Sequence, residues 1–246
     1  MAAYAVRIVC KEDGKITGAM LLSNTISVKI CEIWGLIMNE LSQQINQCKK
    51  PSGEQGKLIA DRMNESHFEL TSWGMEQFSI APDSVILDAG CGGGRTIHRM
   101  AEIASEGKVF GIDYSPDCVA WSSAYNAELI KEGRIEILQA SVNELPFEDN
   151  LFDIVTAVET VYFWPDLAQC FKEIKRVLKP AGKFVIINEV YKSELFRERN
   201  EAYTAAGDMQ IFAPEELKQW LEEAQFKNVT TAVVEANNWL CCIGEK

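Results

Sequence analysis

Glycine and aspartate residues near position 90 form the first pattern that suggests chemistry. The apolar run Val85–Leu87 ends at Asp88, and glycines follow at positions 90, 92 and 94 before a helical pattern begins. Glycine permits positive φ angles and close approach of the backbone to a ligand. A strand, a tight glycine turn and a helix at the carboxyl edge of a parallel sheet are typical of a nucleotide-binding site. A turn without a ligand is the alternative interpretation.

Two carboxylates and a tyrosine narrow the class of nucleotide. Asp88 would repel a pyrophosphate passing close to the turn, whereas it would attract an ammonium group or a nearby sulfonium. Asp113 ends the next predicted strand, about 20 residues beyond the glycines, where a carboxylate accepts hydrogen bonds from ribose hydroxyls. Tyr114 follows it and is placed to lie against an adenine ring. These residues predict a ligand with a purine, a ribose and a positive charge, and without a pyrophosphate.

The residues lie in a stretch that alternates predicted strands with predicted helices. Strands are expected at residues 84–88, 108–113, 134–139, 152–158, 183–189, 227–235 and 238–243, and helices at 95–104, 116–131, 166–178 and 214–225. Such alternation builds a parallel sheet with helices on both faces, so the sequence predicts a doubly wound α/β fold. Two further helical stretches at 54–80 precede the first strand.

The first 50 residues differ in character from the rest. An Asp-Gly turn between two apolar runs predicts a hairpin within residues 5–22. Apolar residues spaced from Ile30 to Ile45 predict one face of an amphipathic helix. This helix is expected to pack on the main domain, and a homodimer contact or a membrane-surface helix are the alternatives.

A break in the pattern at Lys49–Gly53 gives the predicted boundary between two parts of the chain. Residues 1–50 form an N-terminal accessory segment, which we expect to be dispensable for ligand binding. Residues 51–246 form the domain that carries the chemistry. Within it, residues 51–82 are expected to be lid helices and residues 191–213 an insertion on the substrate side.

Composition and charge argue against several classes of binding partner and against a membrane span. The chain of 246 residues has 24 Lys plus Arg against 36 Asp plus Glu, and the net charge of −12 argues against nucleic acid or an anionic membrane as partner. The stretch 18–38 is too polar to span a membrane. Eight cysteines lie scattered, without a CxxC pair or zinc-ligand spacing. We therefore expect reduced thiols, a cytoplasmic protein and no metal site.

Four motifs together resemble a known family. They are LDAGCGGG at 87–94, GIDYS at 111–115, ASVNELPFEDNLFDIV at 140–155 and FKEIKRVLKPAGKFVIINE at 171–189. In this combination the chain resembles the class I S-adenosylmethionine-dependent methyltransferases, in the small-molecule branch with the ubiquinone/menaquinone biosynthesis methyltransferases. The resemblance covers about residues 54–246. It implies a Rossmann-like, mostly parallel seven-stranded sheet whose last strand is antiparallel.

The resemblance also implies roles for individual residues toward S-adenosylmethionine. The methionine part would be held by Asp88 and the backbone of Gly90, Cys91 and Gly92, the ribose by Asp113, the adenine by Tyr114, Ser141 and Val142, and the donor methyl would be bordered by Glu159 and Thr160. Many relatives carry an aspartate where this chain has Ser141, so the hydrogen bond to the adenine amino group differs here or comes from the backbone.

The expected reaction is methyl transfer from S-adenosylmethionine to a small apolar or aromatic molecule. A general base is optional, and the candidates are Glu159, Tyr162 and His67, with Glu189 as a further one. Tyr162 is alternatively an aromatic packing residue, and His67 a capping or surface residue. The acceptor pocket is expected to be lined by Trp73, Phe78, Tyr191, Phe196, Tyr203 and Phe212.

Two other functions compete with methyl transfer. A protein that binds S-adenosylmethionine without catalysis would show the same glycine turn and the same Asp113. An NAD-dependent oxidoreductase is the second alternative, but Asp88 and the stretch 140–189 argue against it.

Overall fold

The computed structural model describes residues 24–207 and 209–246. The chain divides into two compact units, Met1–Met38 and Asn39–Lys246, and the division falls inside helix α1 (Asn24–Lys49). The predicted hairpin within residues 5–22 lies outside the described residues. The predicted helix around Ile30–Ile45 is part of α1. Every candidate site residue belongs to the second unit.

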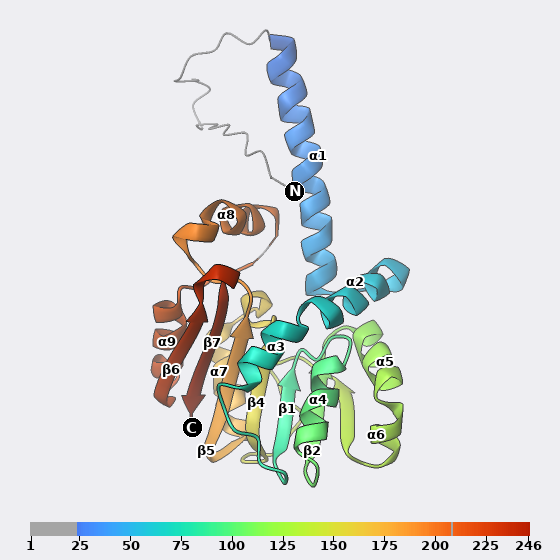
Figure 1. Cartoon of the computed structure of the whole chain (residues 1–246), viewed down its shortest axis with the longest axis vertical. Coiled ribbons are helices and arrows are strands. Elements are labelled where there is room, and N and C mark those ends of the chain that lie inside the picture. The colour runs from blue at the N-terminus through green and yellow to red at the C-terminus, as the bar shows by residue number, and fades with distance from the viewer. Residues whose placement is uncertain (1–23, 208) are drawn as a thin grey trace. The chain divides into compact units, whose positions relative to one another are not determined.

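The second unit contains a seven-stranded sheet in the order β3-β2-β1-β4-β5-β7-β6 (Figure 1). The strands are β1 Val85–Ala89, β2 Lys108–Asp113, β3 Ile135–Gln139, β4 Phe152–Val158, β5 Leu178–Asn188, β6 Lys227–Val234 and β7 Trp239–Glu245. Strands β1 to β5 run parallel, whereas β7 pairs antiparallel with both β5 and β6. This arrangement confirms the predicted doubly wound α/β fold and its antiparallel last strand.

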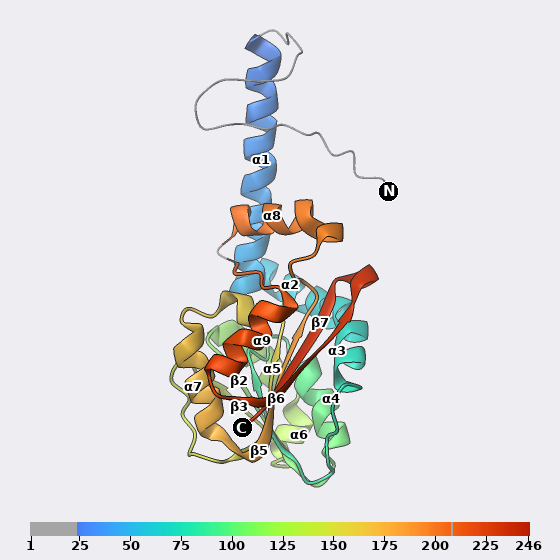
Figure 2. The ribbon, with the colours of Figure 1, turned by 90° about the vertical axis from the view of Figure 1, so that its left-hand side faces the viewer.

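Helices cover both faces of the sheet because each strand alternates its apolar side chains between two buried clusters. Ile86 packs in the cluster that holds α3 and α4, and Leu87 packs in the cluster that holds α7 and α9. Figure 2 shows the sheet on edge between these two helix layers. The helices of the unit are α2 Gly53–Ser66, α3 Phe68–Met75, α4 Arg95–Ile103, α5 Pro116–Tyr125, α6 Ala127–Lys131, α7 Leu167–Val177, α8 Arg197–Ala206 and α9 Pro214–Glu223.

Two predicted elements differ from the structure for identifiable reasons. The helix expected at 116–131 is divided into α5 and α6 at Asn126, whose side-chain amide donates to the carbonyls of Gly94 and Ser122 at 3.0 and 2.9 Å. Strand β5 begins at Leu178 rather than at 183, because Leu178 already pairs with Phe152 before an irregularity in the register. Among the described residues, no helix combines the length and the apolar character that a membrane span requires.

Candidate functional site

A cavity of about 400 Å³ lies at the carboxyl edge of the sheet, where β1, β2 and β4 end. Its lining includes nearly all of the residues that the sequence singles out: His67, Asp88, Gly90, Cys91, Gly92, Asp113, Tyr114, Ser141, Val142, Glu159 and Thr160. Tyr162 is not part of the lining, but its hydroxyl donates to a Glu159 carboxylate oxygen. The structure therefore brings these residues together around one cavity, and their roles toward a ligand stay predictions.

Two glycines of the turn after β1, Gly90 and Gly92, have different surroundings. The N–H groups of Gly90 and Cys91 both donate to the carbonyl of Ile112, at 2.8 and 2.9 Å, which ties the turn to the end of β2. Gly90 has a φ of 95°, and a Cβ there would lie 2.4 Å from the Thr160 methyl group. Gly92 has a φ of 50°, but a Cβ there would meet nothing within 4 Å. Gly90 is thus required by packing, whereas Gly92 leaves open space in the cavity.

Asp113 is held in place by backbone donors at the end of β2. One carboxylate oxygen accepts from the N–H of Gly92 at 3.0 Å, and the other accepts from the N–H of Ser115 at 2.9 Å. Burial raises the pKa of Asp113 above its ordinary value, although these hydrogen bonds act in the opposite direction. A carboxylate offers about four lone-pair sites, and backbone groups of Ser115, Gly92 and Tyr114 act on this one, so it keeps acceptor capacity for a hydroxyl donor from the cavity.

Asp88 is almost completely buried at the end of β1, with 1% of its surface exposed. Its carboxylate accepts from the hydroxyl of Thr156, on the neighbouring strand β4, at 2.6 Å. Burial raises the pKa of Asp88 to about 7, and the hydrogen bond from Thr156 offsets part of that effect. The side chain is therefore close to half protonated at neutral pH, and a cationic group bound beside it would favour the charged form.

Tyr114 and the segment after α1 form one wall of the cavity. The Tyr114 hydroxyl donates to the carbonyl of Lys49 at 2.6 Å, and the Lys50 ammonium lies 5.1 Å from the centre of the Tyr114 ring. The Ser115 hydroxyl donates to the carbonyl of Pro51 at 2.9 Å. Lys49 and Pro51 line the cavity, although the sequence pattern there indicates only a boundary. No local signal could have revealed this wall, because it depends on contacts about 65 positions apart in the chain.

The opposite rim carries Ser141 and Val142, which the family pattern places near an adenine edge. Val142 is buried, whereas Ser141 is exposed and donates its hydroxyl to the side chain of Asn143 at 2.5 Å. The Ser141 hydroxyl therefore uses its one proton within its own turn, but its oxygen can still accept a hydrogen bond. Both this oxygen and the backbone of the rim are available to a purine amino group.

Helices α2 and α3 are anchored to the glycine turn and to the first turns of α4. The Asn64 side chain donates to the carbonyl of Gly93 at 3.4 Å, and Arg95 donates to the carbonyl of Asn64 at 3.0 Å. The Phe68 ring has guanidinium groups nearby on both Arg95 and Arg99, at 4.7 and 4.3 Å from its centre. Asn64, Arg95 and Arg99 line the cavity and were missed in the sequence, where an amide and arginines on helices indicate nothing specific.

Glu159 and His67 line the cavity and belong to a polar group that also includes Tyr162 and Glu189. Glu159 follows β4 with a φ of 59°, and its carboxylate accepts from the Tyr162 hydroxyl and from the N–H of Glu189. Burial and, next, the Glu189 carboxylate raise the pKa of Glu159 above its ordinary value. Burial lowers the pKa of His67, at the junction of α2 and α3, and this effect outweighs the opposite influence of Glu189.

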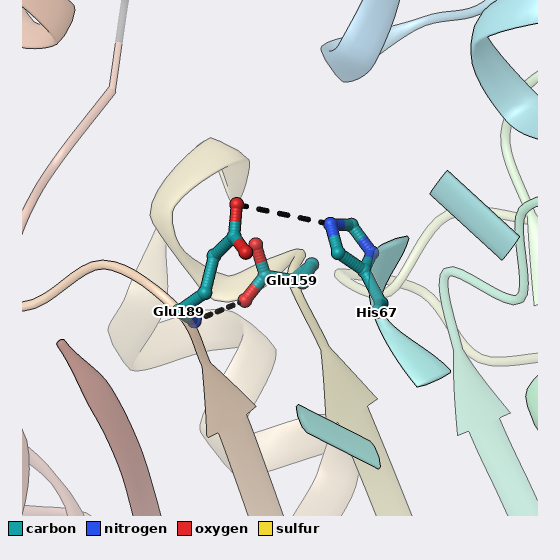
Figure 3. Close-up of side chains that lie close together, drawn as sticks. All are labelled: His67, Glu159 and Glu189. Carbon is teal, nitrogen blue, oxygen red and sulfur yellow. Dashed lines mark hydrogen bonds and ion pairs between the residues drawn. The ribbon is translucent and has the colours of Figure 1, made fainter. Parts of the chain in front are cut away.

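Figure 3 shows His67, Glu159 and Glu189 pointing toward one another from three separate elements. The imidazole of His67 lies 3.8 Å from a Glu189 carboxylate oxygen. One ligand atom from each of the three residues falls within 4.8 Å of the others. The sequence predicts no metal site because its Cys and His spacing is wrong for zinc, but spacing along the chain cannot reveal a group assembled from distant segments.

The aromatic residues expected around the acceptor do not lie where the sequence places them. None of Trp73, Phe78, Tyr191, Phe196, Tyr203 and Phe212 is among the described residues that line the cavity, so this prediction is wrong for the cavity. Most of them pack into the apolar clusters of the fold, as Trp73 does against Trp239 at 5.9 Å between ring centres. The aromatic lining comes from Tyr114, Phe163 and Trp164.

Comparison with known proteins finds a matching family model and related methyltransferases. A family model described as a methyltransferase domain matches residues 80–225. Demethylmenaquinone methyltransferase of Bacillus mycoides (strain KBAB4) is 34% identical over 114 residues, which are 46% of this chain and 48% of that protein. Sterol 4-C-methyltransferase of Caenorhabditis elegans is 26% identical over 153 residues, 62% of this chain and 44% of that protein. The chain thus spans about half the length of the curated relatives it matches.

Solved structures show the same fold at lower identity. A SAM-dependent methyltransferase from Aquifex aeolicus superposes with a TM-score of 0.57 and 21% identity, over 83% of this chain and 96% of that one. Human N-acetylserotonin methyltransferase in complex with SAM gives a TM-score of 0.66 and 15% identity, over 79% of this chain and 56% of that one.

The family model covers more than half of the 246 residues. Its span includes the glycine turn, Asp113 at the end of β2 and Glu159 after β4, all of which line the cavity. The chain therefore belongs to the methyltransferase domain family, which confirms its resemblance to the class I S-adenosylmethionine-dependent methyltransferases.

Proposed function

We propose that the protein transfers a methyl group from S-adenosylmethionine to a small apolar, ring-bearing acceptor. The observation that carries the proposal is a single cavity with two chemically different ends. One end has the glycine turn with Asp88 and Asp113, and the other has His67 and Glu159. A donor with a ribose and a cationic amino-acid part fits the first end, and the polar group of an acceptor fits the second.

The proposed donor site assigns one charged or polar group to each part of the cofactor. Asp88 and the backbone at Gly90, Cys91 and Gly92 hold the methionine part, and Asp113 accepts hydrogen bonds from the ribose hydroxyls. Tyr114 offers one ring face to the adenine, since Lys50 lies over the ring on one side. Ser141 and Val142 border the purine edge, and Thr160 lies between the turn and the donor methyl, with its hydroxyl donating to the carbonyl of Ala89 at 3.0 Å.

The chemistry requires alignment more than it requires a strong base. Methyl transfer from a sulfonium is an in-line displacement, and positioning the two reactants accounts for about 7–11 kcal/mol of barrier lowering in favourable cases. The anchored lid helices and the wall at residues 49–51 limit the access of water to the reacting atoms. Where the acceptor has a proton to lose, we expect Glu159 to receive it, and the hydrogen bond from Tyr162 and the nearby His67 support this role.

The residues that line the cavity and the names of two curated relatives support the proposed class of acceptor. Met63, Phe163 and Trp164 supply apolar and aromatic surface to the cavity. The names of the two curated relatives specify demethylmenaquinone and a sterol as the molecules that those proteins methylate. Both are apolar molecules with rings. The proposed location is the cytoplasm, because the six cysteines in the described part of the chain are all free, as in a reducing compartment.

Calorimetric titration of the full chain with S-adenosylmethionine, S-adenosylhomocysteine and NAD tests the donor half of the proposal. Binding of the first two ligands and no heat with NAD is the expected result. Binding of NAD with no response to S-adenosylmethionine would show that an oxidoreductase cofactor occupies the cavity and would overturn the proposal. Mass spectrometry of small molecules that copurify with the protein identifies acceptors for the second half.

A further inference from the structure

Two carboxylates and an imidazole lie close together beside the cavity, and the attraction of the Arg199 guanidinium is the weakest of the influences on the pKa of Glu159. Glu159 and Glu189 come from the ends of the adjacent strands β4 and β5, and His67 comes from the junction of α2 and α3 (Figure 3). Among the described residues, no Lys or Arg forms an ion pair with either carboxylate. Two carboxylates this close favour a bound cation, because the cation offsets the repulsion between their charged forms.

The His67 side chain gives an independent indication of a missing partner. Its exposed fraction is 18%, and among the described residues its ion-pair partner is a Glu189 oxygen at 3.8 Å, a distance too long for a hydrogen bond. Buried polar side chains usually have a hydrogen-bond partner or a metal ion. The backbone of His67 is held in place, because its N–H donates to the carbonyl of Met63 and its carbonyl accepts from the N–H of Thr71.

The carboxylates also keep the lone pairs that an ion needs. Each Glu159 oxygen accepts one hydrogen bond, from Tyr162 or from the N–H of Glu189, and a carboxylate oxygen has a second lone pair. These two donors orient Glu159 as the supporting hydrogen bonds of metal-binding carboxylates do. The side chain of Glu189 is 42% exposed and makes no hydrogen bond to another described residue, so its carboxylate can turn toward an ion.

The three ligand atoms lie slightly farther apart than the ligands of a bound metal ion do. They fall within 4.8 Å of one another. Ligands at metal distances of 2.0–2.2 Å in tetrahedral or octahedral geometry lie about 3 Å apart. A rotation of the exposed Glu189 side chain closes a gap of this size. One nitrogen with two carboxylate oxygens suits Mn²⁺ or Zn²⁺ better than Mg²⁺ or Ca²⁺, which prefer oxygen ligands alone.

We propose that His67, Glu159 and Glu189 bind one divalent transition-metal ion, Mn²⁺ or Zn²⁺, at the acceptor end of the cavity. Three protein ligands leave coordination positions open toward the cavity, as in catalytic metal sites. An oxygen atom of the acceptor would occupy one of them and be fixed opposite the donor methyl. This role of the ion rests on the proposed methyl transfer, whereas binding of the ion does not.

Metal titration of the full chain after treatment with a chelator tests the proposal. The probes are Mn²⁺, followed by electron paramagnetic resonance, and Zn²⁺, followed by calorimetry. We expect one ion per chain, and at least a tenfold weaker affinity in Glu189→Gln and in His67→Gln. The matched control is His98→Gln, because His98 also lies 3.8 Å from a glutamate, Glu102, but both residues lie on α4 and no third ligand joins them among the described residues. Its affinity should equal that of the unsubstituted chain.

The same samples are titrated with S-adenosylmethionine and melted to verify the fold. Absence of a bound ion in a folded chain that binds S-adenosylmethionine would overturn the metal site and leave the proposed methyl transfer intact. Equal ion affinity in Glu189→Gln and in the unsubstituted chain would overturn it as well. Ion binding without any affinity for S-adenosylmethionine would instead support the site and contradict the proposed function.

Discussion

Cofactor affinity should depend on pH through Asp88, whose carboxyl group is buried beside the glycine turn. Burial raises its pKa to about 7 in the ligand-free chain. The ammonium of the methionine part binds the charged carboxylate, so affinity is fully present above that pKa and is lost as pH falls through it. If only the charged form binds, the dissociation constant scales as 1 plus 10 raised to pKa minus pH. Between pH 7.5 and pH 6.0 it should therefore rise about eightfold.

The measurement is calorimetric titration with S-adenosylmethionine at several pH values from 6.0 to 7.5. This window stays below the titration of a free α-amino group, near pH 8. His67 and Glu159 also lie in the cavity, so Asp88→Asn serves to separate the contribution of Asp88. We expect Asp88→Asn to bind more weakly and to lose the eightfold dependence. A flat profile in the unsubstituted chain, or an unchanged slope in Asp88→Asn, would refute this account of Asp88.

Three further changes have expected outcomes. Asp113→Ala should weaken S-adenosylmethionine binding about tenfold to hundredfold, because hydrogen bonds to a charged group contribute about 1.5–3 kcal/mol; an unchanged dissociation constant in a folded variant contradicts the ribose assignment. Gly90→Ala should lower the melting temperature more than Gly92→Ala, since only at Gly90 would a Cβ lie 2.4 Å from a methyl group, and thermal unfolding of both variants shows the order. Removal of residues 1–38 should preserve cofactor affinity, whereas removal of residues 1–50 should weaken it by deleting a cavity wall; equal affinities in calorimetry would show that the wall is unimportant.

The donor end of the site was predictable because its residues sit on local strand–turn–helix units. The apolar run before Asp88 and the glycines after it specify β1, its turn and α4 within a few positions. Asp113 ends β2 for the same reason. Since carboxyl ends of parallel strands meet at one edge of a sheet, predicting these strands was enough to bring the two carboxylates to one cavity.

The rest of the site depends on packing between distant segments. The sequence pattern predicts that residues 1–50 are dispensable for ligand binding. In the structure, however, Ile45 is buried in an apolar cluster and the carbonyl of Lys49 accepts a hydrogen bond from Tyr114. The aromatic residues were assigned to the acceptor pocket from their residue type alone. Aromatic residues also pack in buried cores, and the residue type does not distinguish the two locations. Glu189 and His67 meet only because α2, α3 and β5 converge, which no spacing along the chain encodes.

Transfer of labelled methyl from S-adenosylmethionine to an apolar quinol or sterol tests the central claim most directly. The full chain is incubated with methyl-tritiated cofactor and acceptor, and the label that partitions into an organic phase is counted. The predicted result is transfer by the unsubstituted chain and at least a tenfold lower rate in Asp113→Ala at subsaturating cofactor. Tight binding of S-adenosylmethionine with no transfer to any apolar ring-bearing acceptor would contradict the claim and identify a cofactor-binding protein without catalysis.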